Sequence, residues 1–249
     1  RDVRKIVRMV PKTRQTLFLS ATLPAEIANL ASDLLKHPSY VAVTPAASVG
    51  GRIQQKVLFV EQGDKLALLT SVLKMNGMDR TLVFTRTKHR ADLVMRQLAN
   101  AGISADSIHS NKNQKERQRA LAAFDRGRIK VLVATDIVAR GIDVEGISHV
   151  VNFELPNDPE SYIHRIGRTA RAGAGGVALS FCDFQEVAML KEIEKLTRSP
   201  LTTVDDHPFH AATIGSLCRG KPGSRSSNGR RRLRSRGSMT RRGGRRRPT

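Results

Sequence analysis

The chain of 249 residues has little of what several protein classes require: it contains no tryptophan, two tyrosines and two cysteines. Cys182 and Cys218 cannot by themselves build a disulfide framework or a four-ligand zinc site, so we expect a reducing cytoplasmic setting. No apolar run approaches the roughly 20 residues that a membrane-spanning helix needs, which argues against an integral membrane protein. The scarcity of aromatic rings also disfavours recognition of bases by stacking.

Acidic residues are absent from the last 39 positions, where Ala211 to Thr249 hold 13 Lys and Arg. The first 210 positions are better balanced, with 30 basic and 22 acidic residues, and the whole chain carries a formal charge of +21. Such a segment buries too little apolar surface to offset the entropy of ordering, so we expect 201–249 to be a disordered Arg/Gly/Ser-rich tail. We interpret it as an electrostatic tether to nucleic-acid phosphates, with a solubilising tail as the alternative.

Apolar segments alternate with amphipathic ones through the body of the chain. Strands are expected at 53–60, 81–84, 104–108, 130–134, 149–153 and 176–181. Helices are expected between them, at 65–75, 88–101, 114–124, 159–166 and 184–196. This rhythm predicts an α/β fold with a parallel sheet covered by helices on both faces. Ligands of such sheets bind at the carboxyl ends of the strands, so chemistry is to be sought directly after each strand.

The first 52 residues form a shorter pattern of their own. A strand is expected at 15–20, a helix from Pro24 to about His37, and a second strand at Tyr40–Val43. The Ala, Ser, Pro and Gly residues that follow are typical of a linker. Because the sequence starts with Arg1 rather than Met, we expect it to begin inside a longer gene product.

Hydroxyls, arginines and glycines follow the expected strands, at 85–88, 109–111, 135–143 and 164–173. Gathered at one edge of a sheet, they would bind phosphates, because guanidinium forks and backbone N–H groups pair with phosphate oxygens. Arg165, Arg168 and Arg171 recur every three residues, which places them near one face of a helix. They could clamp a transferring phosphoryl group or form a solvated basic helix end, and the spacing alone favours neither.

Three segments carry a family resemblance: Ser-Ala-Thr at 20–22, Ala-Thr-Asp-Ile-Val-Ala-Arg-Gly-Ile-Asp-Val at 134–144 and His-Arg-Ile-Gly-Arg-Thr-Ala-Arg-Ala-Gly at 164–173. Their order and spacing resemble motifs of the DEAD-box ATP-dependent RNA helicases. Residues 83–87 and 114–117 resemble two further motifs of the second RecA-like domain of that family. Within the family, the chain is similar to the bacterial RhlE-like group.

The resemblance implies a domain organisation. Residues 1–44 would be the C-terminal remnant of the first RecA-like, ATP-binding domain, and 45–52 a linker. Residues 53–200 would be the second RecA-like domain, the helicase C-terminal domain. The expected fold is therefore a RecA-like parallel sheet with helices on both faces, flanked by a remnant and a basic tail.

The resemblance also implies the nucleotide contacts. Arg168 and Arg171 match the arginine fingers that contact the γ-phosphate of ATP, and Asp143 matches the residue that contacts the ribose. His164 and Arg165 match positions that connect the nucleotide site to the closed interface between the domains. The catalytic residues expected here are thus His164, Arg165, Arg168 and Arg171.

RNA contacts are implied in the same way, mostly through phosphates and 2′-hydroxyls and without sequence preference. Ser20 and Thr22 match the segment that couples hydrolysis to strand separation. The residues expected to hold the RNA backbone are Arg86, Gln114, Arg117, Thr135 and Gly141.

Two positions depart from the family pattern, and two family motifs are missing. Ser110 and Ala170 stand where the family usually has glycine, which affects local backbone geometry more than identity. The sequence contains neither Gly-x-x-x-x-Gly-Lys-Ser/Thr nor Asp-Glu-Ala-Asp. In the family these motifs hold ATP and Mg²⁺ from the first domain, so we expect no metal ligands here and no activity from this chain alone.

Two functions remain open at this point. In the first, the chain is part of an ATP-dependent RNA helicase, an ATP hydrolase that couples ATP binding and hydrolysis to unwinding or remodelling of RNA duplexes. In the second, it is a non-enzymatic RNA-binding module made of a RecA-like domain and a basic tail. The absent phosphate-binding loop favours the second for this chain, and the arginine motif favours the first for the parent protein.

Overall fold

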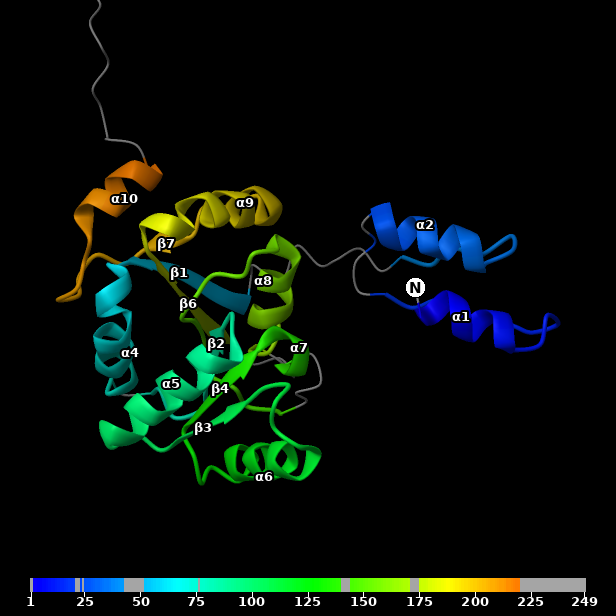
Figure 1. Ribbon diagram of the computed structural model, residues 1–249. Coiled ribbons are helices and arrows are strands. Elements are labelled where there is room, and N and C mark those ends of the chain that lie inside the picture. The colour runs from blue at the N-terminus through cyan, green and yellow to red at the C-terminus, as the bar shows by residue number, and fades with distance from the viewer. Residues whose placement is uncertain are drawn as a thin grey trace, which may run out of the picture.

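The computed structural model describes residues 2–20, 23, 25–42, 52–75, 77–139, 144–170 and 175–219. Within these ranges one seven-stranded sheet forms the centre of the molecule, and every strand pairing in it is parallel (Figure 1). The strand order is β3-β4-β2-β5-β6-β1-β7. The strands are β1 (Ile53–Phe59), β2 (Thr81–Thr85), β3 (Ala105–Ile108), β4 (Val131–Thr135), β5 (His149–Asn152), β6 (Gly176–Cys182) and β7 (Thr202–Thr203).

Helical segments follow the strands, and all of them except the last connect one strand to the next, as parallel pairing requires. They are η1 (Gln62–Asp64), α4 (Lys65–Leu73), α5 (Lys88–Asn100), α6 (Gln114–Asp125), α7 (Asp136–Ala139), α8 (Pro159–Ile166), η2 (Phe184–Glu186), α9 (Val187–Thr197) and α10 (Ala212–Arg219). The sequence predicts the six longer strands and the helices α4, α5, α6, α8 and α9 to within a few residues, but it does not predict the short helix α7. The α/β parallel-sheet prediction is confirmed.

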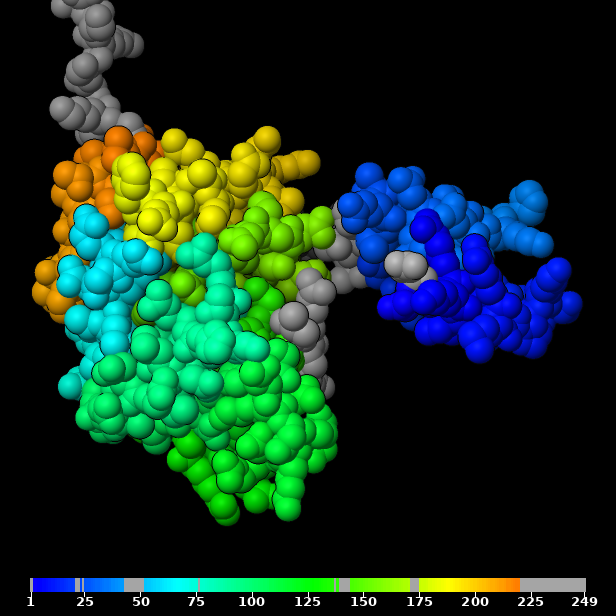
Figure 2. Space-filling model, viewed as in Figure 1, coloured from blue at the N-terminus to red at the C-terminus, as the bar shows by residue number. Residues whose placement is uncertain are grey.

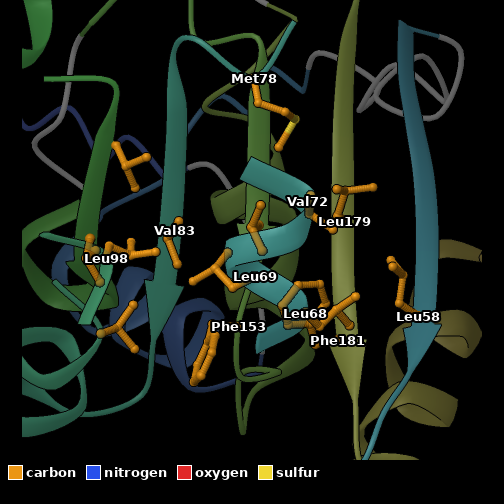
Figure 3. Packing of buried hydrophobic residues seen from close by; sticks show 14 of the residues in the cluster. Leu58, Leu68, Leu69, Val72, Met78, Val83, Leu98, Phe153, Leu179 and Phe181 are labelled. Atoms are coloured by element: carbon orange, nitrogen blue, oxygen red, sulfur yellow. The ribbon is translucent and has the colours of Figure 1, made fainter. Parts of the chain in front are cut away.

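Alternation along the strands divides the core into two layers. On one face, Leu58, Val83 and Phe181 pack beneath α4 and α5, and Figure 3 shows the leucines of α4 lying against these strands. On the other face, Phe84 packs with Phe124 of α6, while Phe59 packs with the side chains of α8, α9 and α10. Because both faces are covered, the central strands β2 and β4 are buried along their whole length.

Local capping fixes where the helices near the carboxyl ends of the strands begin. Asn113 and Glu116 form a reciprocal capping box at the start of α6, with N–H···O distances of 2.8 and 2.9 Å. The side chain of Asp158 accepts hydrogen bonds from the first turn of α8, and Pro159 follows it at the first helical position. These caps set the direction in which both helices leave the sheet.

The N-terminal segment comprises α1 (Asp2–Met9) and α2 (Ala25–Leu34), and its packing is sparse. Ala31 is its single buried residue among those described, and Leu19 and Val41 are each 92% exposed. The strands expected at 15–20 and 40–43 are wrong for the described residues, because no neighbouring strand is present to pair with them; Val43 lies outside the described ranges. In Figure 2 this blue segment is distinct from the continuous body of residues 53–219.

The sequence predicts that the disordered tail starts at residue 201, which is too early. Residues 201–219 form β7 and α10, and Leu201, Ala211 and Ile214 are buried against the sheet. The Arg219 guanidinium closes this extension by donating to Glu194 Oε1 at 2.7 Å and to the Leu201 carbonyl at 2.8 Å. Residues 220–249 lie outside the described ranges. Across the described part of the chain, no helix is long and apolar enough to span a membrane.

Candidate functional site

The carboxyl ends of β2, β4 and β5 meet at one edge of the sheet, which we call the carboxyl edge. Thr85 at the end of β2 lies opposite Thr135 at the end of β4, and both side chains are buried. Phe84 lies opposite Asn152 on the other side of β2. Arg86 follows Thr85 directly, so the parallel register brings two of the expected RNA-binding residues, Arg86 and Thr135, to the same edge.

Arg86 is held at this edge by two carboxylates. Its Nη2 lies 3.2 Å from Glu186 Oε1 and 3.8 Å from Glu154 Oε1. Its backbone N–H donates to Glu154 Oε2 at 2.9 Å. The side chain remains 26% exposed, so part of the guanidinium still faces outward.

Behind Arg86 lies a buried ion cluster that the sequence pattern does not reveal. The Lys65 ammonium donates to Asp183 Oδ2 at 2.9 Å and to Glu186 Oε2, and Glu186 is fully buried. Burial raises the pKa of Glu186, although Lys65 and Arg86 act in the opposite direction. The one signal in the sequence is the Asp-x-x-Glu spacing of 183–186, which forms a capping box at η2.

Arg165 is an interior residue. It is 1% exposed and forms a bidentate pair with Asp136, with Nε–Oδ1 at 2.6 Å and Nη2–Oδ2 at 2.8 Å. Its Nη1 donates to Asn152 Oδ1 and to the Glu154 carbonyl, and its Cζ lies 5.0 Å from the centre of the Phe84 ring. Arg165 thus ties α8 to Asp136 of α7 and to the segment that ends β5. Because this arginine is buried and paired with Asp136, it is not part of a solvated basic helix end.

His164 and Arg168 lie on and just after the last turn of α8, and both are partly exposed. The Arg168 Nε–H donates to the His164 carbonyl at 3.3 Å. Ser20 is described and exposed in the N-terminal segment. The remaining expected site residues, Thr22, Gly141, Asp143 and Arg171, lie outside the described ranges.

Gln114 and Arg117 occupy the first turn of α6. Gln114 is exposed, and Arg117 is partly buried. The Arg117 Nε atom is shielded from solvent and has no hydrogen-bond partner among the described residues. A buried N–H without an acceptor is costly, and a phosphate or hydroxyl oxygen would satisfy it.

A polar group at the end of β3 supports the neighbouring loop. His109 Nε2 lies 2.8 Å from Asp92 Oδ1, and the Ser107 hydroxyl donates to the same oxygen at 2.7 Å. Burial alone would raise the pKa of Asp92, but the hydrogen bonds from Ser107 and His109 outweigh it and leave that pKa below its usual value. Asp92 thus stays ionised and holds the loop that leads to α6.

Taken together, the carboxyl edge presents arginine, hydroxyl and amide groups, a donor set suited to phosphate and hydroxyl oxygens. Within the described ranges, no three His, Cys, Asp or Glu side chains come together as metal ligands.

Comparison with known proteins agrees with this geometry. Residues 64–173 match the family model described as the helicase conserved C-terminal domain. The DEAD-box ATP-dependent RNA helicase CshA of Bacillus subtilis is 40% identical over 214 residues, which cover 86% of this chain and 43% of that protein. The chain thus spans less than half the length of this curated relative.

Solved structures of DEAD-box proteins also resemble this chain. Escherichia coli SrmB, a DEAD-box protein solved with a regulator of ribonuclease activity, is 35% identical, with a TM-score of 0.57 over 61% of this chain and 90% of that one. Saccharomyces cerevisiae Dbp5 bound to RNA and ADP BeF3 is 31% identical, with a TM-score of 0.74 over 80% of this chain and 54% of that one.

The fold and the site define a RecA-like helicase C-terminal domain. The chain belongs to the DEAD-box RNA helicase family. The family resemblance stated from the motifs is confirmed, while the likeness to the RhlE-like group stays a prediction.

Proposed function

We propose that this chain is the C-terminal part of an ATP-dependent RNA helicase, which couples ATP binding and hydrolysis to unwinding or remodelling of RNA. The carboxyl edge carries this proposal. Arg86 and Thr135 end adjacent strands there, and Arg117 keeps a buried N–H without an acceptor among the described residues. These groups suit the phosphates and 2′-hydroxyls of an RNA backbone and read no base edge, so binding is independent of sequence.

The second part of the proposal concerns the contacts with ATP. Arg168 is partly exposed after α8, and a guanidinium there fits the oxygens of a triphosphate. Arg168 and Arg171 donate to the γ-phosphate, and Asp143 contacts the ribose. ATP supplies the bond whose hydrolysis drives the cycle, and the first domain of the parent protein holds its Mg²⁺. His164 and Arg165 connect the nucleotide site to the closed interface between the domains, and Arg165 also ties α8 to Asp136.

The N-terminal segment fits the same assembly. Residues 1–44 are proposed as the end of the first RecA-like domain, and 45–52 as the linker between the domains. The large exposure of Leu17, Leu19 and Val41 supports this, because such side chains normally pack in a domain interior. Ser20 and Thr22 would then belong to the segment that couples ATP hydrolysis to RNA strand separation. For the whole protein we propose a cytoplasmic location.

A salt titration of RNA binding tests the RNA surface. Fluorescent single-stranded RNAs of two unrelated sequences are titrated with the full chain, the chain ending at Arg219, and the Arg117→Ala variant. Residues 220–249 hold 12 Lys and Arg. Each neutralised phosphate contributes roughly −0.7 to the slope of log K against log salt, so the shortened chain should show a slope flatter by several units.

The Arg117→Ala variant should bind both RNAs more weakly, with a slope flatter by about 0.7. Arg119→Ala removes an exposed arginine from the same helix and is the matched control. Equal affinity of Arg117→Ala and the unchanged chain would contradict an RNA surface at α6. Equal slopes with and without residues 220–249 would make the tail a solubilising extension.

A non-enzymatic RNA-binding module is the second candidate, because the 249 residues contain no phosphate-binding loop or Asp-Glu-Ala-Asp motif. Both candidates share the RNA surface and differ in the use of Arg168. The ATPase measurement that closes the Discussion separates them.

A further inference from the structure

The buried ion cluster behind Arg86 has no part in the function proposed so far. It joins segments that are far apart in the sequence: Lys65 begins α4, Glu154 follows β5, and Glu186 ends η2. Three positive groups face three carboxylates, from Lys65, Arg86 and Arg90 on one side and Asp183, Glu154 and Glu186 on the other. The positive and negative side chains of the cluster therefore balance one another.

Glu186 is the centre of this cluster, and its two carboxylate oxygens have different tasks. Oε2 accepts from the Lys65 ammonium and, at 3.4 Å, from the backbone N–H of Asp183. Oε1 accepts from the backbone N–H of Leu155 at 3.0 Å and lies 3.2 Å from Arg86 Nη2. Because Lys65 and the backbone fix the plane of the carboxylate, Oε1 is directed at Arg86.

Glu186 also fixes the second partner of Arg86. Its bond to the Leu155 N–H anchors the segment that follows β5. Glu154, the preceding residue, accepts the backbone N–H of Arg86 at 2.9 Å. Both ends of Arg86, its backbone and its guanidinium, therefore depend on the position of Glu186.

A free arginine samples many rotamers, and binding to a ligand must overcome the loss of that freedom. A guanidinium already fixed by a buried carboxylate has lost that freedom before RNA arrives. Arg86 keeps 26% of its side chain exposed, and its Nη1 donates to a weak acceptor, the Met189 sulfur, at 4.0 Å. Donors therefore remain for a phosphate while Glu186 stays in place.

We propose that Glu186, held by Lys65, is a positioning residue that presents the Arg86 guanidinium to the RNA backbone. The inference rests on the proposed RNA-binding function of the carboxyl edge. It assigns Glu186 a role through Arg86 and no contact with RNA. A carboxylate that merely competed with phosphate for Arg86 would have the opposite effect on affinity.

A double-mutant cycle tests the inference. The full chain binds a ten-nucleotide single-stranded RNA at about 0.3 M salt, which weakens binding by the many charges of the tail more than a single local contact. Arg86→Ala should weaken binding about tenfold, as expected for loss of a charged hydrogen bond. Glu186→Gln should weaken it severalfold, and should cause no further loss when Arg86 is already alanine.

Two variants guard against a general loss of structure. Glu186→Asp keeps the charge that Lys65 needs but withdraws the carboxylate from Arg86, so it should fold and still weaken RNA binding. Glu192→Gln changes an exposed glutamate of the neighbouring α9 and should leave affinity unchanged. Urea denaturation of each variant measures folding separately.

The failures are distinguishable. Unchanged affinity of Arg86→Ala would remove Arg86 from the RNA surface and contradict the proposed function at this position. A loss with Arg86→Ala together with normal affinity of both Glu186 variants would overturn the inference alone. Equal losses from Glu186 substitutions with and without Arg86, or tighter binding by Glu186→Gln, would overturn it as well.

Discussion

At the scale of single residues, Ala170 has a backbone conformation that alanine tolerates poorly. Its φ is 57°, in the left-handed region where glycine has no steric cost. Ser110, the other departure from the family's glycines, is not among the described residues with positive φ. The two substitutions therefore have different structural consequences, although both replace glycine with a small residue.

Replacing Ala170 with glycine should stabilise the chain by up to about 1 kcal/mol, because relief of the backbone strain exceeds the added entropy of the unfolded chain. Ser110→Gly is the matched control. It should lower the stability of the chain, because it increases the entropy of the unfolded chain without relieving any backbone strain. Urea denaturation followed by circular dichroism measures both changes. Shifts of the same sign for the two variants would show that the conformation at Ala170 carries no strain.

His149 makes stability depend on pH. Burial, assisted by Lys56, holds the pKa of His149 below its usual value near 6.5. The folded chain then binds fewer protons than the unfolded chain in this window, so stability is fully present above about pH 6.5 and falls as the pH drops. His207 has a pKa lowered by burial and by His210 and adds to the same trend.

His149→Gln should reduce, without abolishing, the difference in unfolding free energy between about pH 7.5 and about pH 5.5. His89→Gln, a change at an exposed histidine of α5, serves as the control and should leave that difference unchanged. Urea titrations at the two pH values give the comparisons. A pH difference unaltered by His149→Gln would show that His149 is not desolvated in the folded state.

At the scale of elements, α10 escapes prediction from the sequence because it has only 8 residues and is followed by a basic segment. Ile214 is 2% exposed, whereas Leu217 on the same helix is 57% exposed. The basic residues that follow 219 dominate the composition of the C-terminal part and hide this short docking helix. By contrast, β2 and β4 are almost continuous runs of apolar and β-branched residues, and the other longer strands alternate with amphipathic helical segments, which is why their positions could be predicted.

Ile214→Ala should destabilise the chain by about 2–4 kcal/mol, because it removes a buried side chain that packs against the sheet. Leu217→Ala should change stability by less than about 0.5 kcal/mol. Chemical denaturation of the two variants compares a buried and an exposed position on one helix. A neutral Ile214→Ala would mean that residues 201–219 belong to the tail after all.

The candidate site was predictable where it depends on strand ends and not where it depends on contacts between distant segments. Arg86 and Thr135 follow apolar runs, so parallel pairing alone brings them together. The burial of Arg165 depends on Asp136, which lies on another element, and the spacing of the arginines contains no sign of it. Lys65 and Glu186 are 121 positions apart, so only the folded chain shows their pairing.

At the scale of the whole molecule, the chain combines a packed domain with groups that we propose to bind RNA and ATP. The sheet places Arg86, Thr135 and the start of α6 at its carboxyl edge, and His164 on α8 and Arg168 just after α8 lie beside the same sheet. Arginine fingers stabilise developing phosphate charge only when another element holds the nucleotide in place. We therefore expect this chain to contribute to catalysis only in combination with an ATP-binding domain.

RNA-stimulated ATP hydrolysis by a fusion tests this central claim most directly. The fusion joins this chain to a first RecA-like domain that carries the Gly-x-x-x-x-Gly-Lys-Ser/Thr and Asp-Glu-Ala-Asp motifs. We predict no activity above background for the chain alone, RNA-stimulated hydrolysis by the fusion, and a loss of about 10³-fold in kcat on Arg168→Ala. Hydrolysis by the chain alone, or a fusion whose kcat is unaffected by Arg168→Ala, would contradict it.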